Sequence, residues 1–147
     1  MTAKQMAQAE LVALQQIVDG VKDADTEALE KEIAQAKRIF VGGAGRSLLS
    51  MKGFAMRLMQ TGHETYLVGE VCTPSVQPGD LLIVGSGSGE TKVTLDVVNK
   101  AKGHGARVAV LTMHGNSPIA QACDCAVVLA GIPAVSPEDT EASIFAK

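Results

Sequence analysis

The sequence predicts an α/β fold: a five-stranded parallel sheet flanked by layers of helices, with two further helices at the N-terminus. Short apolar runs alternate along the chain with segments whose apolar residues recur at helical spacing. Two of these runs end in glycine-rich turns that lead directly into a helical segment. Parallel neighbouring strands need crossover connections, which usually place helices on the faces of the sheet. The alternation therefore favours an open, doubly wound three-layer sandwich.

Helical spacing of apolar residues predicts two helices before the first strand. The first helix has an apolar stripe at Leu11, Leu14, Val18 and Val21. Asp25 or Thr26 can cap the start of the second helix, because these side chains accept hydrogen bonds from unpaired backbone N–H groups. The apolar stripe of the second helix consists of Leu29, Ile33 and Ala36.

Five short apolar runs are the expected strands. They lie at residues 39–41, 65–68, 81–84, 107–111 and 126–129. The run at 81–84 is continuously apolar, which is typical of a parallel strand buried on both faces. The helix after the first strand is expected to present Leu48, Met51, Ala55, Leu58 and Met59. The helix after the third strand is expected to present Val93, Val97 and Ala101 and to stop at Gly103.

Composition narrows the classes of function. The chain has 147 residues, 46% of them apolar, which suits one ordinary globular domain. A net charge of −3 argues against a broad nucleic-acid surface, and one Tyr, three Phe and no Trp offer no stacking platform for single strands. No apolar run approaches the ~20 residues that a bilayer requires. We therefore expect a cytoplasmic protein whose partners include neither nucleic acid nor membrane.

Neither the cysteines nor the histidines form a metal-ligand pattern. The cysteines are Cys72, Cys123 and Cys125, an odd number without a zinc-binding pair of knuckles. The histidines, in separate turns, are His63, His104 and His114. We expect Cys123 and Cys125, two residues apart, to face the same side of a strand as core residues. The sequence thus predicts no metal site and no disulfide scaffold.

The strongest candidate site is the turn after the third strand. Its residues are Gly85, Ser86, Gly87, Ser88, Gly89, Glu90 and Thr91. Glycines let the backbone close around an anion, and the hydroxyls and the free N–H groups of a helix start donate hydrogen bonds to it. A phosphate monoester fits these donors. The alternative interpretation is a flexible strand-to-helix loop with a serine cap.

The turn after the first strand offers a second ligand wall. It runs Gly42-Gly43-Ala44-Gly45-Arg46-Ser47, with Arg46 as a cation and Ser47 as a donor. The alternative interpretation is that Arg46 is an exposed residue at a helix start that contacts only solvent. Leu48 replaces the third glycine of a dinucleotide fingerprint, and neither turn has the spacing of a nucleoside-triphosphate loop. A nucleotide cofactor is therefore not expected.

Two carboxylates fall near this expected site. Glu70 follows the second strand, and Glu90 opens the helix after the third strand. Glu90 also has a purely structural interpretation, because a negative charge in the first turn complements the helix dipole.

Four strings taken together resemble the 6-phospho-3-hexuloisomerase family of the sugar isomerase (SIS) superfamily. They are Gly43-Ala44-Gly45-Arg46-Ser47, Phe54-Ala55-Met56-Arg57-Leu58, Val68-Gly69-Glu70 with Thr73-Pro74, and Gly85-Ser86-Gly87-Ser88-Gly89-Glu90-Thr91. The resemblance runs in order from about residue 11 to residue 129. It implies an SIS-type three-layer sandwich and a single phosphosugar-binding domain over residues 1–147.

The same resemblance implies an activity and a site. Enzymes of this family interconvert arabino-3-hexulose 6-phosphate and fructose 6-phosphate in the ribulose monophosphate route of formaldehyde fixation, and they are typically tetramers. By resemblance, Ser47 and residues 86–91 hold the sugar phosphate, with Gly45 and Arg46 beside them. One base takes the C2 proton, an enediol forms, and a proton returns at C3. No cofactor or metal is needed.

The resemblance breaks at the C-terminus. In the family a segment of the form P-M-G-x-x-F-E opens a final helix and supplies the base, whereas residues 140–147 read TEASIFAK. The resemblance therefore places the family's glutamate beyond Lys147, and no catalytic residue is assigned within the sequence. Glu141 is not given that role for its nearness alone. We expect a domain without the family's C-terminal helix. The alternative function is a non-catalytic SIS module that binds or senses a phosphosugar.

Self-association is the last expectation from the sequence. The N-terminal helices carry more apolar surface than a five-stranded sheet can cover. We expect a homo-oligomer, either a dimer or a tetramer.

Overall fold

The computed structural model describes residues 1–129 and confirms the α/β sandwich. Its five strands are all parallel, in the order β2-β1-β3-β4-β5. The strands are β1 (Ile39–Gly43), β2 (Thr65–Leu67), β3 (Leu81–Gly85), β4 (Arg107–Thr112) and β5 (Cys125–Val128). Each begins within one residue of the start expected from its apolar run, and β1, β3 and β4 extend one or two residues further.

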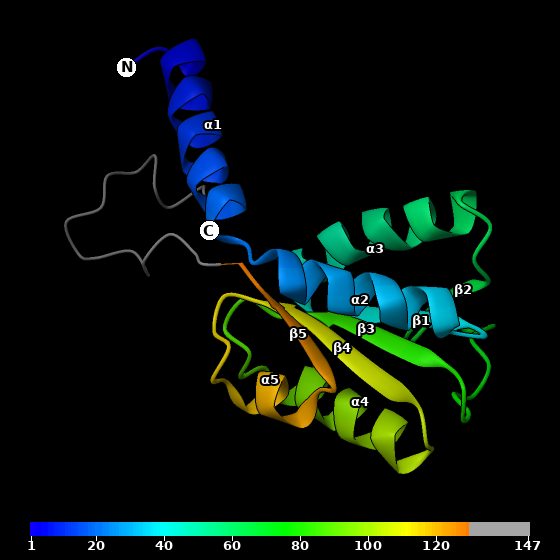
Figure 1. Cartoon of the computed structure of the whole chain (residues 1–147). Coiled ribbons are helices and arrows are strands. Elements are labelled where there is room, and N and C mark those ends of the chain that lie inside the picture. Colours follow the sequence, from blue (N-terminus) through cyan, green and yellow to red (C-terminus); the bar gives the residue numbers. More distant parts are fainter. Residues whose placement is uncertain (130–147) are drawn as a thin grey trace.

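Helices cover both faces of the sheet (Figure 1). They are α1 (Ala3–Gly20), α2 (Asp23–Gln35), α3 (Gly45–Gln60), α4 (Lys92–Gly103) and α5 (Pro118–Ala122). Helices α2 and α3 lie on one face, and α4 and α5 lie on the other. The chain thus winds helices onto both sides of one sheet, as the sequence predicts.

Two apolar clusters fill the spaces between the layers. Val41 and Ile83 pack toward α2 and α3, in contact with Met51 and Leu58. Phe40 and its neighbours on β3 and β4 pack toward α4 and α5. Because successive residues of a strand point to opposite faces, a strand with helices on both sides must be apolar throughout, which explains the uninterrupted run of β3.

The strand order reverses between β1 and β3. From β1 the chain passes through α3 to β2 on one side, and it then crosses to β3 on the other side of β1. The last residues of the two strands, Gly43 and Gly85, are paired in register. In open parallel sheets this reversal leaves a crevice at the carboxyl ends of the strands, where ligands bind. Both glycine-rich turns begin there.

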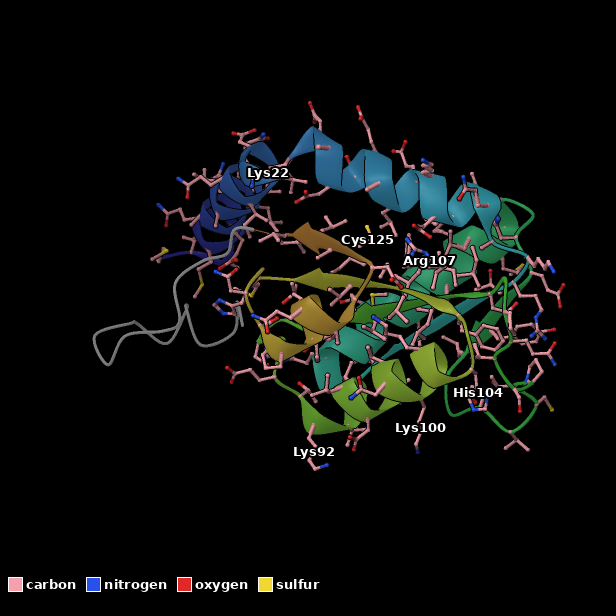
Figure 2. All side chains as sticks on the ribbon, turned by 60° about the horizontal axis from the view of Figure 1, so that its bottom comes forward. Lys22, Lys92, Lys100, His104, Arg107 and Cys125 are labelled. Atoms are coloured by element: carbon pink, nitrogen blue, oxygen red, sulfur yellow. The ribbon has the colours of Figure 1, made fainter. Side chains whose placement is uncertain are left out.

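Ion pairs connect the starts of interior strands to neighbouring segments. Arg107 at the start of β4 lies beneath α2 (Figure 2), with its Nε 3.1 Å from a carboxylate oxygen of Glu32 and its Nη1 3.2 Å from one of Asp124. The irregular connection between β2 and β3 is held at its end by the buried Asp80, which accepts from the Arg38 Nε at 3.0 Å. The sheet is thereby tied to α2 and to the connection between β2 and β3.

Several expectations within the elements are wrong. Helix α2 starts at Asp23 with Lys22 as its uncapped N-cap, so neither Asp25 nor Thr26 caps it. On α4 the buried residues are Thr94, Val98 and Ala101, while Val93 is 66% exposed. Because threonine is counted as polar, the apolar periodicity predicted a buried face of α4 that lies one residue away from the observed face. Met59 of α3 is likewise exposed.

Cys123 and Cys125 do not share a strand face. The strand begins only at Cys125, and Cys123 ends α5. Cys125, labelled in Figure 2, is buried in the cluster under α2 and α3, whereas Cys123 packs into the opposite cluster. Both thiols occupy apolar surroundings, as expected, but on opposite sides of the sheet. All three cysteines are free in the structure.

Helix α1 projects away from the sandwich (Figure 1). None of its residues is buried, and Leu11, Leu14 and Val18 are each more than half exposed. No helix among residues 1–129 has the length and hydropathy to cross a membrane.

Candidate functional site

The turn between β3 and α4 is shaped by its own serines. The buried Ser86 hydroxyl accepts from the Gly89 N–H at 3.2 Å and lies 3.4 Å from the Thr91 hydroxyl. The exposed Ser88 hydroxyl accepts from the Glu90 N–H at 3.2 Å. These bonds close residues 86–91 into a compact loop at the end of a fully buried strand.

Backbone donors of this turn remain available. Within residues 1–129, no acceptor pairs with the N–H groups of Gly87, Ser88 or Thr91. Thr91 is also the N-cap of α4, and its side chain caps none of the first-turn amides. A set of unpaired amides at a helix start concentrates positive potential and favours an anion. This arrangement suits the phosphate that the sequence predicts.

Gly89 locks the turn against the segment after β4. Its φ is +67°, and a Cβ built there would lie 2.0 Å from the Ser117 hydroxyl oxygen. The Gly89 carbonyl accepts from the Ile119 N–H at 3.0 Å, and the Gly87 carbonyl accepts from the Met113 N–H at 3.1 Å. Only glycine combines this backbone conformation with this closeness to a neighbouring chain segment.

The second turn that is expected to contact the ligand lies at the start of α3. Gly45 has a φ of +54°, Arg46 is exposed and Ser47 is half-buried. The N-cap residue Ala44 makes no side-chain hydrogen bond to the helix, so the first-turn amides of α3 have no side-chain cap. Arg46 forms no ion pair with any residue in the described part of the chain.

Small residues bring the two turns together. A Cβ on Gly43 would lie 3.0 Å from the Gly85 carbonyl oxygen, and a Cβ on Gly85 would lie 2.6 Å from the Cγ of Met51. Glycine at both strand ends therefore permits β1, β3 and α3 to approach closely. The two glycine turns therefore start from neighbouring strand ends, at the point where the strand order reverses. Gly45, Arg46 and Ser47 line neither of the two cavities described below.

A polar cavity of about 300 Å³ opens beside the serine-glycine turn. Its lining residues are Ser88, Glu90, His114, Asn116 and Ser117. The last three come from the segment between β4 and α5, and the sequence did not assign them to the site. Their sequence signal is weak, since His114 and Asn116 follow a strand without any motif. Adjacency of β3 and β4 in the sheet is what brings them to the turn.

A larger cavity of about 430 Å³ lies elsewhere, between the connection after β2 and the last turns of α4. Its walls are largely apolar, and it contains no residue of either glycine turn. Glu70 lines this larger cavity and pairs with Lys52 of α3 at 3.2 Å. We place the site at the smaller cavity, because Ser88, whose backbone N–H is unpaired, lines it together with Glu90 of the same turn.

The described residues offer no metal site. No group of three or more His, Cys, Asp or Glu side chains is placed to hold an ion within residues 1–129. Burial raises the pKa of the Cys123 thiol to about 12, which keeps it protonated and unreactive as a ligand at neutral pH.

No catalytic base is assigned from the sequence. The segment from residue 140 to Lys147, with Glu141 in it, lies outside the described residues. The expectation that the family's glutamate falls beyond Lys147 therefore stays a prediction, as does the expected lack of a final helix.

Comparisons with known proteins identify a domain family for most of this chain. A model of the SIS domain matches residues 32–144. The 3-hexulose-6-phosphate isomerase of Methylomonas aminofaciens is 42% identical over 118 residues, which are 80% of this chain and 65% of that protein. The protein of the same name from Bacillus subtilis is 42% identical over 113 residues, 77% of this chain and 61% of that protein. The chain thus spans less than two thirds of these relatives.

A solved structure agrees with the sequence matches. It is that of a hypothetical protein from Methanococcus jannaschii, for which the structure infers a molecular function of 3-hexulose-6-phosphate isomerase. It superposes with a TM-score of 0.76 at 30% identity and covers 97% of this chain and 79% of that one. Since the family model takes in all five strands and both glycine turns, the chain belongs to the SIS domain family.

Proposed function

We propose that this chain carries the phosphosugar site of a 6-phospho-3-hexuloisomerase, which interconverts arabino-3-hexulose 6-phosphate and fructose 6-phosphate. The observation that carries the proposal is the set of unpaired amides at Gly87, Ser88 and Thr91, at the strand-order reversal. The names of the two relatives at 42% identity support the choice of substrate. Residues 1–147 form one phosphosugar-binding domain in this proposal.

The proposed roles follow the positions of the residues. The phosphate accepts hydrogen bonds from the turn at residues 86–91, and Ser47 adds a hydroxyl from the start of α3. The guanidinium of Arg46 balances phosphate charge from the exposed side. Gly45 and Gly89 hold the backbone conformations that these contacts require.

The isomerisation itself needs a base and no cofactor. A base removes the C2 proton, an enediol forms, and a proton is returned to C3, so that the carbonyl moves between these carbons. Glu70 lines the larger cavity and is engaged with Lys52, while Glu90 lines the polar cavity. We assign no base among residues 1–129.

The cellular setting belongs to the same proposal. We propose a cytoplasmic enzyme of the ribulose monophosphate route of formaldehyde fixation, acting as a homo-oligomer. The exposed apolar residues of α1 support self-association.

Calorimetric titration with fructose 6-phosphate tests the phosphate site. We expect Ser88→Ala to weaken binding by roughly 10- to 150-fold, the effect of losing about 1.5–3 kcal/mol of hydrogen bonding to a charged group. Ser88 is exposed, so the thermal unfolding of the variant should match the wild type. Ser75→Ala is the matched control, because Ser75 is also exposed and lies in the connection before β3. Equal affinities of wild type and Ser88→Ala would exclude the Ser88 hydroxyl as a phosphate donor, and no binding by the wild type would remove the site.

Activity is measured separately, as the formation of fructose 6-phosphate from arabino-3-hexulose 6-phosphate. Binding of fructose 6-phosphate together with turnover supports the isomerase. Tight binding without turnover favours the non-catalytic phosphosugar module.

A further inference from the structure

We propose that the polar cavity beside the serine-glycine turn receives the hydroxyl-bearing carbons of the sugar phosphate, and that His114 and Asn116 recognise those hydroxyls. The inference rests on the proposed function, because it extends the same site from the phosphate to the rest of the ligand.

The chemistry of the lining favours a polyol. All five residues around the cavity, Ser88, Glu90, His114, Asn116 and Ser117, carry an oxygen or nitrogen in the side chain. A sugar presents both a donor and an acceptor at each hydroxyl, and the amide, imidazole and hydroxyl groups of this wall supply both kinds of partner. An apolar ligand would leave these polar groups unpaired at a cost in binding free energy.

The cavity continues from the phosphate turn. Ser88 and Glu90 belong to that turn, and the unpaired N–H groups of Ser88 and Thr91 flank Glu90 along the chain. A phosphate held by these amides therefore places the carbons bonded to it at the mouth of the cavity. Its volume of about 300 Å³ lies at the small end of the range for ligand sites, as suits a six-carbon molecule.

The segment that carries His114 is fixed relative to the turn. The Thr112 hydroxyl donates to the Gly87 carbonyl at 3.3 Å and accepts from the His114 N–H at 3.3 Å. The Ser117 N–H in turn donates to the His114 carbonyl at 3.1 Å. Hydrogen bonds thus join the turn at residues 86–91 to the segment at residues 112–117. Such pre-organisation lowers the entropy lost on binding.

Two side chains of the wall are available to a ligand. The imidazole of the exposed His114 and the side-chain amide of the exposed Asn116 make no hydrogen bond to any residue between 1 and 129. The Ser117 hydroxyl, by contrast, accepts from the Ala120 N–H at 3.3 Å and is buried against Gly89. Ser117 therefore serves as wall, whereas His114 and Asn116 contact the ligand.

A comparison of two ligands separates this inference from the phosphate site. Fructose 6-phosphate and inorganic phosphate are titrated calorimetrically into the wild-type chain and its variants. We expect His114→Ala and Asn116→Ala each to weaken binding of fructose 6-phosphate by roughly three- to tenfold, the effect of one hydrogen bond. Binding of inorganic phosphate should stay within about twofold of the wild type, because an ion held by the turn does not extend to His114 and Asn116. His114→Gln, which keeps a hydrogen-bonding group, should recover part of the affinity.

His104→Ala is the matched control. His104 is also exposed, but it lies at the far end of α4 from Lys92, as Figure 2 shows, and it does not line the polar cavity. We expect this variant to bind both ligands like the wild type.

The outcomes distinguish the two proposals. If the wild type binds fructose 6-phosphate and neither His114→Ala nor Asn116→Ala changes its affinity, the inference is wrong while the phosphate site stands. Equal losses for inorganic phosphate and fructose 6-phosphate would place His114 at the anion and would also overturn the inference. If the wild type binds no fructose 6-phosphate, the proposed function itself fails.

Discussion

At Gly89, one residue sets the distance between two segments of the site. Its backbone adopts the left-handed region, where an L side chain costs roughly 1–2 kcal/mol. The hydroxyl that a Cβ would meet cannot simply rotate away, because Ser117 is buried and caps the Ala120 N–H. Both the backbone conformation at position 89 and its close contact with Ser117 therefore require glycine.

Gly89→Ala tests this double requirement. We expect the free energy of unfolding to fall by about 2 kcal/mol or more, from backbone strain and displacement of Ser117. Fructose 6-phosphate binding should fall with it, since the turn is distorted. Gly53→Ala is the control: Gly53 lies within α3 with open space around it, so alanine should raise stability by about 0.5–1 kcal/mol. Chemical denaturation measures both, and an unchanged Gly89→Ala would refute the constraint.

Residue identity singled out the serine-glycine turn as a candidate phosphate site but not the cavity beside it. A run of glycines and serines between a buried strand and a helix indicates an anion site from adjacent residues alone. Residues 86–91 could therefore be singled out from the sequence. His114 and Asn116 reach the same place only because β4 pairs with β3, and no local pattern reports that pairing. The sequence therefore did not predict which residues from distant parts of the chain join this site.

At the scale of elements, strands were easier to predict than helix faces. Burial on both sides forces an apolar run, and such runs marked every strand. Helix α5 has only five residues, too few for a periodic stripe, although Ser117 followed by Pro118 is a helix-start signal. On α4 the sequence could not reveal that Thr94, rather than Val93, faces the core.

The connection from β2 to β3 is the element that relies most on polar contacts. It has no helix, and its fixed point is Asp80, whose carboxylate accepts from Arg38 and, at 2.8 Å, from the Gln77 N–H. Arg38 also donates to the Ser75 carbonyl at 3.1 Å and lies over the ring of Phe40. One buried carboxylate thereby orders both the connection and the cation beside it.

Asp80→Asn should destabilise the protein at neutral pH and lose that effect in acid. Burial of the Asp80 carboxyl opposes ionisation, but hydrogen bonds from Arg38 and Gln77 outweigh it and hold its pKa below the ordinary value. A lowered folded-state pKa stabilises above the unfolded value of about 4, and this contribution disappears as pH falls through the folded-state pKa. The melting temperatures of wild type and Asp80→Asn should therefore differ by several degrees at pH 7 and converge below about pH 4. A constant difference across this range would contradict the assignment.

At the scale of the whole molecule, the apolar surface is distributed unevenly. Leu11, Leu14 and Val18 form a stripe on α1 that is 53–65% exposed. Leu49 and Met56 of α3 are also exposed, by 70% and 52%. No residue of α1 is fully buried, although its capping box shows a well-formed helix start. Isolated helices of this length are marginal in water, so we expect a second apolar surface to stabilise α1.

Sedimentation velocity at micromolar concentration tests whether that surface belongs to another copy of the chain. We expect the wild type to sediment as a dimer or tetramer. Leu14→Glu combined with Val18→Glu should shift it toward monomer, because charges in an apolar contact would be desolvated without partners. Ala9→Glu with Gln16→Glu adds the same charge to the other side of α1, at about 100° per residue, and should leave the assembly intact. A monomeric wild type would show that α1 is not an interface between copies, and equal dissociation by both double variants would assign the effect to net charge rather than to the stripe.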